Sequence, residues 1–305
     1  MFRCHYVLEN EKAVTEMKEM HKKRIVRSCF QEYISKIRSV RFLCAVLLMV
    51  ALVCSVAKGM DQLMIDTKEW VTPWMMPHFF DNLYFVTFYG FIICYMYSDV
   101  PFMNRSELYK ILREGRITWC VEKMVAIVLQ AFTMVGLTIF ASILVFVPRL
   151  KFEWEWGRII YTMTYSESLY EYNVFGWLSR IIYTKYTPVQ AMLLCFFMVG
   201  LISSLMGLLM FAVSLYANRM TAVSIAAILT GLNLSGSKFI SASWLPYVIP
   251  FYWCRLSIYG QPVSRVRNYP SLTFYIMLSC IVIGVSVGAI LLRARRIEYI
   301  WNKEE

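Results

Sequence analysis

The stretch YTPVQAMLLCFFMVGLISSLMGLLMFAVSLYAN, residues 186–218, runs for 33 residues without a charged side chain. Crossing the hydrocarbon core of a bilayer takes about 20 apolar residues in helical form, because backbone groups in lipid must be hydrogen-bonded within their own segment. Five further uncharged runs accompany it, namely residues 42–57, 82–98, 124–148, 220–237 and 268–292. None shows the two-residue alternation of a membrane β-barrel. The sequence therefore predicts an all-α membrane protein with six spans.

A seventh uncharged run, residues 239–254, differs from the predicted spans because it contains Pro246 and Pro250. Each proline removes a backbone donor and disfavours a straight helix. We therefore predict a re-entrant or interfacial segment before the last span. The predicted organisation is an N-terminal region over residues 1–41, a six-helix transmembrane domain over residues 42–292 and a tail over residues 293–305.

Composition and charge agree with a membrane location. Of the 305 residues, 59% are hydrophobic and 17% are charged, and the formal net charge is +11. With Lys238 left uncounted, the N-terminal region, the tail and the loops on their side hold twenty Lys and Arg residues, and the opposite loops hold ten. Cytoplasmic loops carry the positive excess, so we predict cytoplasmic termini, and we expect a multi-pass protein of a bacterial plasma membrane. Contact with anionic lipid explains the basic surface without nucleic acid.

Sequence patterns for catalysis and metal binding were sought and not found. The nine cysteines have no CxxC spacing, and the three histidines, His5, His21 and His78, lie outside the predicted spans. Residues 231–238 approach a phosphate-binding loop but lack its Lys before Ser or Thr and the preceding strand. No ionisable residue lies in the middle of a predicted span, which disfavours coupling to protons or sodium. We therefore expect no enzyme activity and no cofactor or metal in this chain.

Residues 16–41 predict an amphipathic basic helix before the first span. Val26, Phe30, Tyr33 and Ile37 recur at helical spacing, with several Lys and Arg residues alongside. Such a helix lies in the headgroup layer and then turns into the span. It is either a plain membrane anchor or a surface that also touches a cytoplasmic partner.

Residues 99–123, between the second and third predicted spans, combine a turn, a helix start and a dense charge pattern. Pro101 stops the second span, and Asn104 followed by Glu107 has the spacing of a capping box. A short helix is predicted to run to about Arg113, with Gly115 ending it. A solvated loop helix without a partner is the alternative.

The predicted outer loop, residues 149–185, is rich in Trp and Tyr, which prefer the membrane interface. We predict short interfacial helices along the outer leaflet. A lid that faces the substrate is the alternative.

Small residues in two of the predicted spans predict close helix packing within the chain, with a homodimer contact as the alternative. They are Gly200, Ser204 and Gly207 in the fourth span, and Gly284 and Gly288 in the sixth.

Three of these segments carry a resemblance to a known family. They are the helix and turn over residues 101–113, the basic helix over residues 16–38 and the broken segment over residues 239–254. Together they resemble the membrane subunit of a type-2 ATP-binding-cassette exporter. The sequence SWLPYVIP, residues 243–250, is similar to that family's approach to its last helix. The long aromatic outer loop departs from the short connection that family members often have. The resemblance implies six membrane helices, cytoplasmic ends, an N-terminal connecting helix, a coupling helix and re-entrant helices before the last span.

The resemblance also implies export through a permease subunit that is powered by a separate cytoplasmic ATPase, which would bind ATP and Mg. A second permease copy or a related permease would complete the transporter. The coupling helix would contain Pro101, Asn104, Glu107, Tyr109, Lys110 and Arg113. Of these, Asn104 and Glu107 would hold the helix in shape. Tyr109, Lys110 and Arg113 would meet the ATPase.

A stripe of aromatic residues in the second predicted span recurs at helical spacing and would line a central path, with plain packing as the alternative. The stripe and two polar residues of the fifth span give the candidate path residues Tyr84, Phe88, Phe91, Tyr95, Asn233 and Ser237. Lipid, peptide, drug and polysaccharide all fit such an aromatic, nearly uncharged path. Two rival functions stay open: an ATP-independent secondary transporter or channel, and a membrane assembly or immunity factor that only binds a partner.

Overall fold

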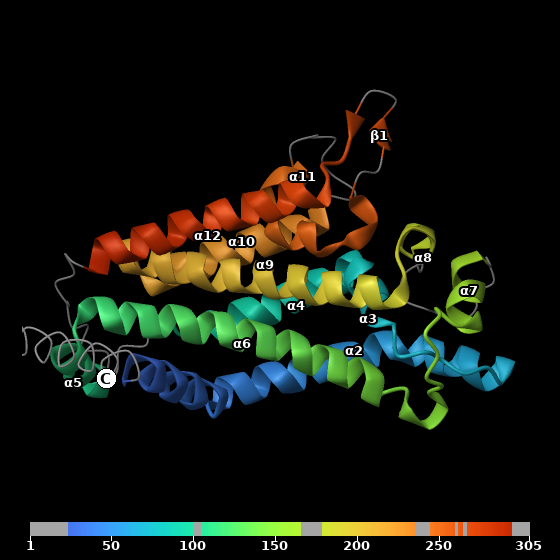
Figure 1. The fold of residues 1–305 in the computed structure, drawn as a ribbon, viewed down its shortest axis with the longest axis horizontal. Coiled ribbons are helices and arrows are strands. Elements are labelled where there is room, and N and C mark those ends of the chain that lie inside the picture. The colour runs from blue at the N-terminus through green and yellow to red at the C-terminus, as the bar shows by residue number, and fades with distance from the viewer. Residues whose placement is uncertain are drawn as a thin grey trace, which may run out of the picture.

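The computed structural model describes six stretches of the chain, and its backbone is mainly helical. The described residues are 24–100, 105–165, 179–235, 245–259, 262–264 and 267–294. The longest helices run beside one another along one bundle axis (Figure 1). Residues 24–37 are helical, which confirms that part of the predicted N-terminal helix.

Within the described residues, four helices are long and apolar enough to cross a membrane, so the chain has the structure of a helical membrane protein. The first, α2 (Val40–Thr67), begins at Ser39, whose hydroxyl accepts a hydrogen bond from the Phe42 amide at 3.2 Å. The other three are α6 (Arg116–Leu144), α9 (Pro188–Tyr216) and α12 (Leu272–Ala294). At a rise of about 1.5 Å per residue, each exceeds the hydrocarbon core of about 30 Å.

Two further predicted spans are helices, but they are shorter. They are α4 (Leu83–Tyr97) with 15 residues and α10 (Arg219–Ser235) with 17 residues. Their lengths are about 22 and 25 Å, less than the hydrocarbon core. For α4 the reason is a sharp start at Asn82, whose side chain accepts hydrogen bonds from the Tyr84 and Phe85 amides. Four helices rather than six therefore meet the length of a span, and six crossings stay a prediction.

The helix at the centre of the bundle is α9, which contacts α6, α12, α10 and α4. In its most apolar window 61% of residues are buried, against 22% in α12. Its sequence is apolar on every side, as expected of a helix that is surrounded by protein. The bundle core therefore forms around α9, and α12 lies at the periphery.

Shorter elements gather at the two ends of the bundle. One end, which we name the α5 end, carries α5 (Arg105–Glu114), the start of α6 and the last turn of α12 (Figure 1). The opposite end, named the α8 end, carries the remaining short elements. These are α3 (Met76–Asp81), η1 (Val147–Arg149), α7 (Arg158–Tyr165), α8 (Arg180–Lys185), α11 (Leu245–Val248), η3 (Pro250–Cys254), η4 (Leu256–Ile258), β1 (Pro262–Ser264) and β2 (Arg267–Asn268).

The α8 end contains the predicted outer loop and the predicted broken segment before the last span. The described parts of residues 149–185 contain the short helices α7 and α8, as predicted for that loop. Residues 245–254 form two short helical pieces, α11 and η3, which confirms a broken segment, whereas residues 239–244 lie outside the described part. The strands β1 and β2 pair antiparallel and are a small exception to the all-α prediction.

Candidate functional site

The short helix predicted between the second and third spans is present as α5, beside the start of α6 (Figure 1). It is followed by Gly115, whose φ of +89° lies in a region that glycine adopts without strain. The chain turns there and continues as α6, so the predicted end of the short helix at Gly115 is confirmed. Pro101 and Asn104 lie outside the described residues.

Glu107 projects from α5 toward α6 and is 9% exposed. Its carboxylate accepts a hydrogen bond from the Trp119 indole N–H at 2.7 Å and lies 3.1 Å from the Lys123 ammonium. The predicted capping box pairs the Glu107 side chain with the backbone amide of Asn104, and Asn104 lies outside the described residues. The contacts that the structure shows hold α5 against the first two turns of α6.

A second buried carboxylate, Glu32 from the helix over residues 24–37, completes a cluster at the α5 end. It binds Lys123 at 2.5 Å and Lys110 at 2.9 Å. Lys110 in turn lies 3.4 Å from Glu107. Opposite charges therefore alternate around a closed circuit of Glu32, Lys123, Glu107 and Lys110, which we name the four-charge ring.

The four-charge ring perturbs the pKa of two of its members, Glu32 and Lys110, and of the neighbouring Lys36. Burial raises the pKa of the Glu32 carboxyl, but Lys123 and Lys110 outweigh it, so the pKa lies below its ordinary value. Burial also works against the charged form of Lys110, yet the two carboxylates hold its pKa above the ordinary value. Beside the ring, burial and then the charge of Lys123 lower the pKa of Lys36 to about 7. The opposite charges around Glu32 and Lys110 therefore favour the ionised forms of these two side chains although burial works against them.

The opposite face of α5 is exposed. Tyr109 and Leu112 are 76% and 80% exposed, and Arg113 one position later is exposed as well. Residues three and four apart on a helix share a face, so these side chains form one surface, named the α5 outer face. Of the residues predicted to meet a partner, Tyr109 and Arg113 lie on this face, whereas Lys110 points into the four-charge ring.

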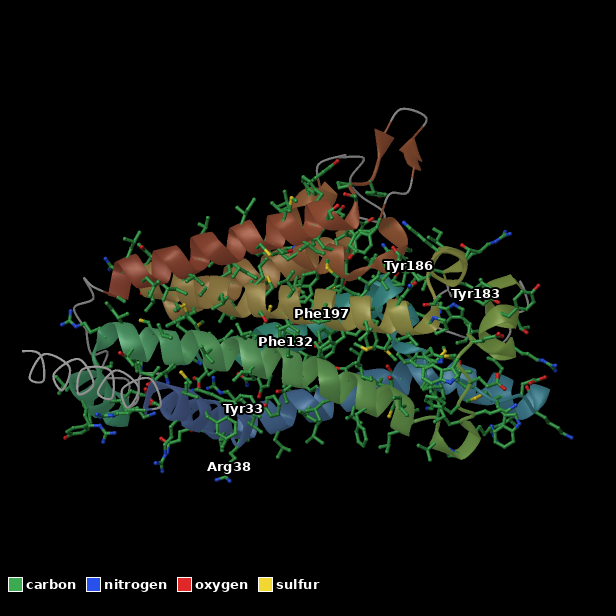
Figure 2. The ribbon with its side chains drawn as sticks, in the orientation of Figure 1. Tyr33, Arg38, Phe132, Tyr183, Tyr186 and Phe197 are labelled. Atoms are coloured by element: carbon green, nitrogen blue, oxygen red, sulfur yellow. The ribbon has the colours of Figure 1, made fainter. Side chains whose placement is uncertain are left out.

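The helix over residues 24–37 exposes apolar as well as charged side chains and buries one carboxylate. Val26 and Phe30 are 62% and 56% exposed, whereas Glu32 is 2% exposed and faces the protein. Tyr33 reaches α6, where its hydroxyl lies 2.6 Å from that of Thr133 (Figure 2 labels Tyr33). Val26 and Phe30 share the outward side with Arg27, a mixture that fits contact with the lipid headgroup layer. The predicted apolar stripe is divided, because Tyr33 and Ile37 are partly buried.

In the described part of the chain, the aromatic stripe of α4 is half exposed, and its member Phe91 lies beside Gly231 of α10. Its members Tyr84, Phe88, Phe91 and Tyr95 are between 37% and 53% exposed. The opposite face of α4 is buried against α2, α9 and α10. A path lined by the stripe would therefore need a second molecule for its other wall.

Asn233, the other described path candidate, lies behind this stripe. It is fully buried, and its amide donates to the Thr87 hydroxyl of α4 at 2.9 Å. Nearby, the Thr230 hydroxyl lies 3.4 Å from the Cys94 thiol. These polar contacts join α10 to α4. Ser237 lies outside the described residues.

Two of the five predicted packing residues are at a close helix contact. A Cβ placed on Gly200 would lie 2.5 Å from the Phe132 ring of α6, and one on Gly207 would lie 2.6 Å from Ile127. Phe132 occupies the space between α6 and α9 (Figure 2). The hydroxyl of Ser204 donates to the Gly200 carbonyl at 2.7 Å and stays within its own helix. The glycines of α9 therefore let it approach α6 within this chain.

The other glycine pair has a different environment. A Cβ added to Gly284 or to Gly288 would have no described atom within 4 Å. The neighbouring Val285 on α12 is 67% exposed. This side of α12 is thus free of contacts within the described part of the chain, and it is open to lipid or to a second molecule.

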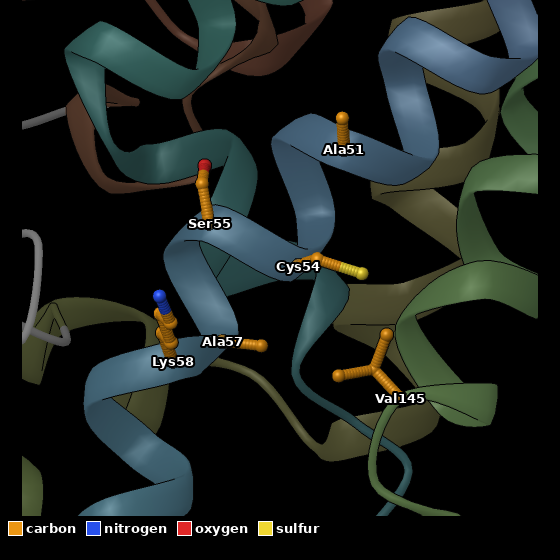
Figure 3. A pocket seen from close by; sticks show the side chains of 6 residues that line it. All are labelled: Ala51, Cys54, Ser55, Ala57, Lys58 and Val145. Atoms are coloured by element: carbon orange, nitrogen blue, oxygen red, sulfur yellow. The ribbon is translucent and has the colours of Figure 1, made fainter.

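A hollow of about 560 Å³ lies between α2 and the end of α6 (Figure 3). It is lined by Ala51, Cys54, Ser55, Ala57, Lys58 and Val145. Most of these residues are exposed, and the Ser55 hydroxyl already donates to the Leu52 carbonyl at 2.7 Å. The hollow is therefore an open surface feature with few polar groups and does not resemble a chamber for a substrate.

The α8 end is held by side chains that bind backbone groups of neighbouring segments. Asp81 of α3 accepts hydrogen bonds from the Ser257 amide and hydroxyl, and its own carbonyl accepts from Arg255 at 2.9 Å. Lys185 of α8 donates to the Tyr259 carbonyl at 2.8 Å. The segment before the last predicted span is thereby fixed to α3 and α8.

Trp156 and Thr72 join the loops of the same end. The Thr72 hydroxyl donates to the Trp156 carbonyl at 2.9 Å, and the Trp156 indole donates to the Tyr186 carbonyl at 3.1 Å. His78 packs edge-on against the Trp156 ring at 5.0 Å, and burial lowers its pKa to about 3. A neutral imidazole inside an aromatic cluster is a packing residue at ordinary pH.

Among the described residues no group of three His, Cys, Asp or Glu side chains is placed to hold a metal ion. Comparison with known protein families, with curated proteins and with solved structures finds no match to this chain. A function for it must therefore be argued from its geometry and from the sequence resemblance.

Proposed function

We propose that this chain is the permease subunit of an ATP-driven exporter, moved by a separate cytoplasmic ATPase that grips the α5 outer face. The observation that carries the proposal is the two-sided character of α5. One side is locked to the membrane helices by buried charges, and the other presents Tyr109 and Leu112 with nothing described over them. A helix that transmits movement from an ATPase to the membrane helices needs both a firm attachment on one side and an exposed surface on the other.

The chemistry of the α5 outer face indicates the kind of surface that would cover it. Aromatic and basic side chains are common at the centre of protein interfaces, where they insert into pockets of the partner. Tyr109 and Leu112 would supply the apolar contact and Arg113 the positive charge. The expected partner surface is an apolar groove with acidic residues at its rim.

The transport path is proposed to form between two permease copies, identical or related. The outward aromatic stripe of α4 gives each copy one wall of such a path, and α10 lies beside α4. In this arrangement all six apolar helices cross the membrane, with both termini and the α5 end in the cytoplasm. Nucleotide and Mg would be bound by the ATPase and not by this chain.

The experiment is to change the α5 outer face without touching the four-charge ring. Leu112→Glu and Arg113→Glu should each remove co-purification of an ATP-hydrolysing subunit while the chain stays inserted. The matched control is Phe152→Glu, an exposed aromatic residue beyond α6 toward the α8 end, which should leave the complex unchanged.

Three outcomes would count against the proposal. Co-purification that survives both α5 changes would show that the α5 outer face is not the contact. Transport by the purified chain in vesicles without ATP would favour the rival secondary transporter or channel. Stable partner binding without any transport would favour the assembly or immunity factor.

A further inference from the structure

The four-charge ring joins three segments that are far apart in the sequence. Glu32 comes from the helix that leads into α2, Glu107 and Lys110 from α5, and Lys123 from α6. Each of the four charges has an opposite charge on both sides of it. No member can be removed without leaving a neighbour with less compensation.

Such a cluster is a poor way to gain stability but a good way to fix geometry. Moving charges out of water is expensive, and a well-packed apolar cluster is often at least as stable as a buried ion pair. Apolar contacts, however, tolerate sliding, whereas charged hydrogen bonds require particular distances and directions. The ring therefore specifies position more than it adds stability.

The covalent connection between α5 and α6 leaves that position undetermined. The two helices are joined through Gly115, and glycine allows many backbone conformations. The Trp119 indole bonded to Glu107 and the buried Ile111 add contacts on the α6 side. Contact of α5 with the helix over residues 24–37 is made through Lys110 and Glu32.

We propose that Glu32 is a positioning residue that, through the four-charge ring, makes α5, the helix over residues 24–37 and the start of α6 move as one body. Force applied to α5 would then reach α2 and α6 together. This use of the ring rests on the proposed exporter function, whereas the fixed geometry can be measured without it.

The test measures the distance between probes on two helices of this body. Labels attached to unnatural amino acids at Arg27 and Leu112, both exposed, leave the nine cysteines unchanged. The purified chain in lipid nanodiscs should give a narrow distance distribution. Glu32→Gln should broaden it and lower the melting temperature by roughly 5 to 15 °C, because Lys123 loses its closest partner in a buried site.

A second variant separates positioning from stability. Glu32→Gln with Lys123→Gln removes one charge of each sign, so the melting temperature should recover while the distance distribution stays broad. Recovery of both would mean that the ring is only structural, and a narrow distribution in both variants would likewise overturn the proposal. If Glu32→Gln does not fold, Lys110→Gln, at the more exposed corner, should broaden the distribution, and its failure to do so would overturn it too.

The outcome is independent of the ATPase, because the measurement uses the chain alone. A rigid ring in a chain that binds no ATPase would contradict the proposed function and leave this inference standing. If the unchanged chain gives a broad distance distribution and still binds an ATPase, this inference is overturned and the proposed function stands.

Discussion

The two ends of the bundle are held together by different chemistry. At the α5 end, three segments meet through four charged side chains and one indole. At the α8 end, the segments meet mainly through single side chains that donate to backbone carbonyls, with aromatic rings packed between them. The first arrangement depends on a connected network of opposite charges, and the second on aromatic packing and on separate hydrogen bonds, several of which involve a charged side chain.

This difference has a mechanical consequence. Contacts at the α8 end are spread over several independent loops, so the loss of one leaves the others in place. Contacts at the α5 end form one network, in which the loss of one charge unbalances the rest. The α5 end should therefore respond to single charge changes strongly and as a unit, and the α8 end weakly and locally.

The largest expected effect follows from removing a cation from the four-charge ring. Lys123→Met removes the buried one of the two cations that Glu32 and Glu107 share and should destabilise the protein by about 3 to 5 kcal/mol. Unfolding in mild detergent, followed by circular dichroism, measures the change. Lys151→Met is the matched control, because Lys151 binds Glu153 at 2.7 Å on the surface and should cost less than about 1 kcal/mol. Equal effects of the two changes would contradict the contrast drawn here.

At the α8 end the comparable change is smaller. Asp81→Ala removes the acceptor of the Ser257 amide and hydroxyl and should cost about 1 to 3 kcal/mol. Amide exchange should rise in residues 250–258 and stay unchanged in α5. Asp81→Asn keeps one carbonyl oxygen as acceptor and should be milder. Increased exchange in α5 would show that the two ends are coupled more tightly than their contacts indicate.

Between the two ends, the contact of α9 with α6 gives a third effect. Gly200→Ala should cost about 1 to 3 kcal/mol, because the added methyl group would overlap the Phe132 ring. Phe132→Leu in the same chain should recover most of the loss. Gly288→Ala, on the open side of α12, should be neutral or slightly stabilising. Melting temperatures of the three variants and of the unchanged protein test this, and a costly Gly288→Ala would place an unrecognised neighbour there.

A further expected effect is on the pH dependence of stability at the α5 end. The pKa of Lys36 is about 7 in the folded protein and near 10.5 in the unfolded chain, so between these values the unfolded chain binds more protons. Stability due to Lys36 should therefore increase from about pH 7 to pH 10 and be absent below pH 7. Lys36→Met should remove this rise. An identical pH profile for the two proteins would contradict the burial of Lys36.

Much of the fold follows from runs of uncharged residues. All six predicted spans contain a helix, because a long apolar run has few other stable forms in lipid. The short helix before Gly115 was also predictable, since a glycine next to a charged amphipathic segment is a local signal. Helix length was less predictable for α2 and α6, because both continue as helix past the charged residues that bound the runs 42–57 and 124–148. The run over residues 82–98, by contrast, matches α4 within one residue at each end.

The four-charge ring was not predicted. Glu32 and Lys123 are 91 positions apart, and no local pattern connects them. The available signals were weak: an acidic residue four positions before Lys36 in a basic helix, and a Glu-Lys pair at the start of a span. Periodicity also predicts that a helix has two faces without stating which one meets lipid, so the outward direction of Val26 and Phe30 required the structure.

The central claim is that a separate motor protein grips the α5 outer face, and photo-cross-linking in native membranes tests it most directly. A photoreactive amino acid at Leu112 should cross-link to a polypeptide that binds and hydrolyses ATP, and the yield should change when nucleotide is added. The same amino acid at Phe152 should not capture that polypeptide. Cross-linking of Leu112 to lipid alone, or its labelling by an impermeant reagent from outside the cell, would contradict the account.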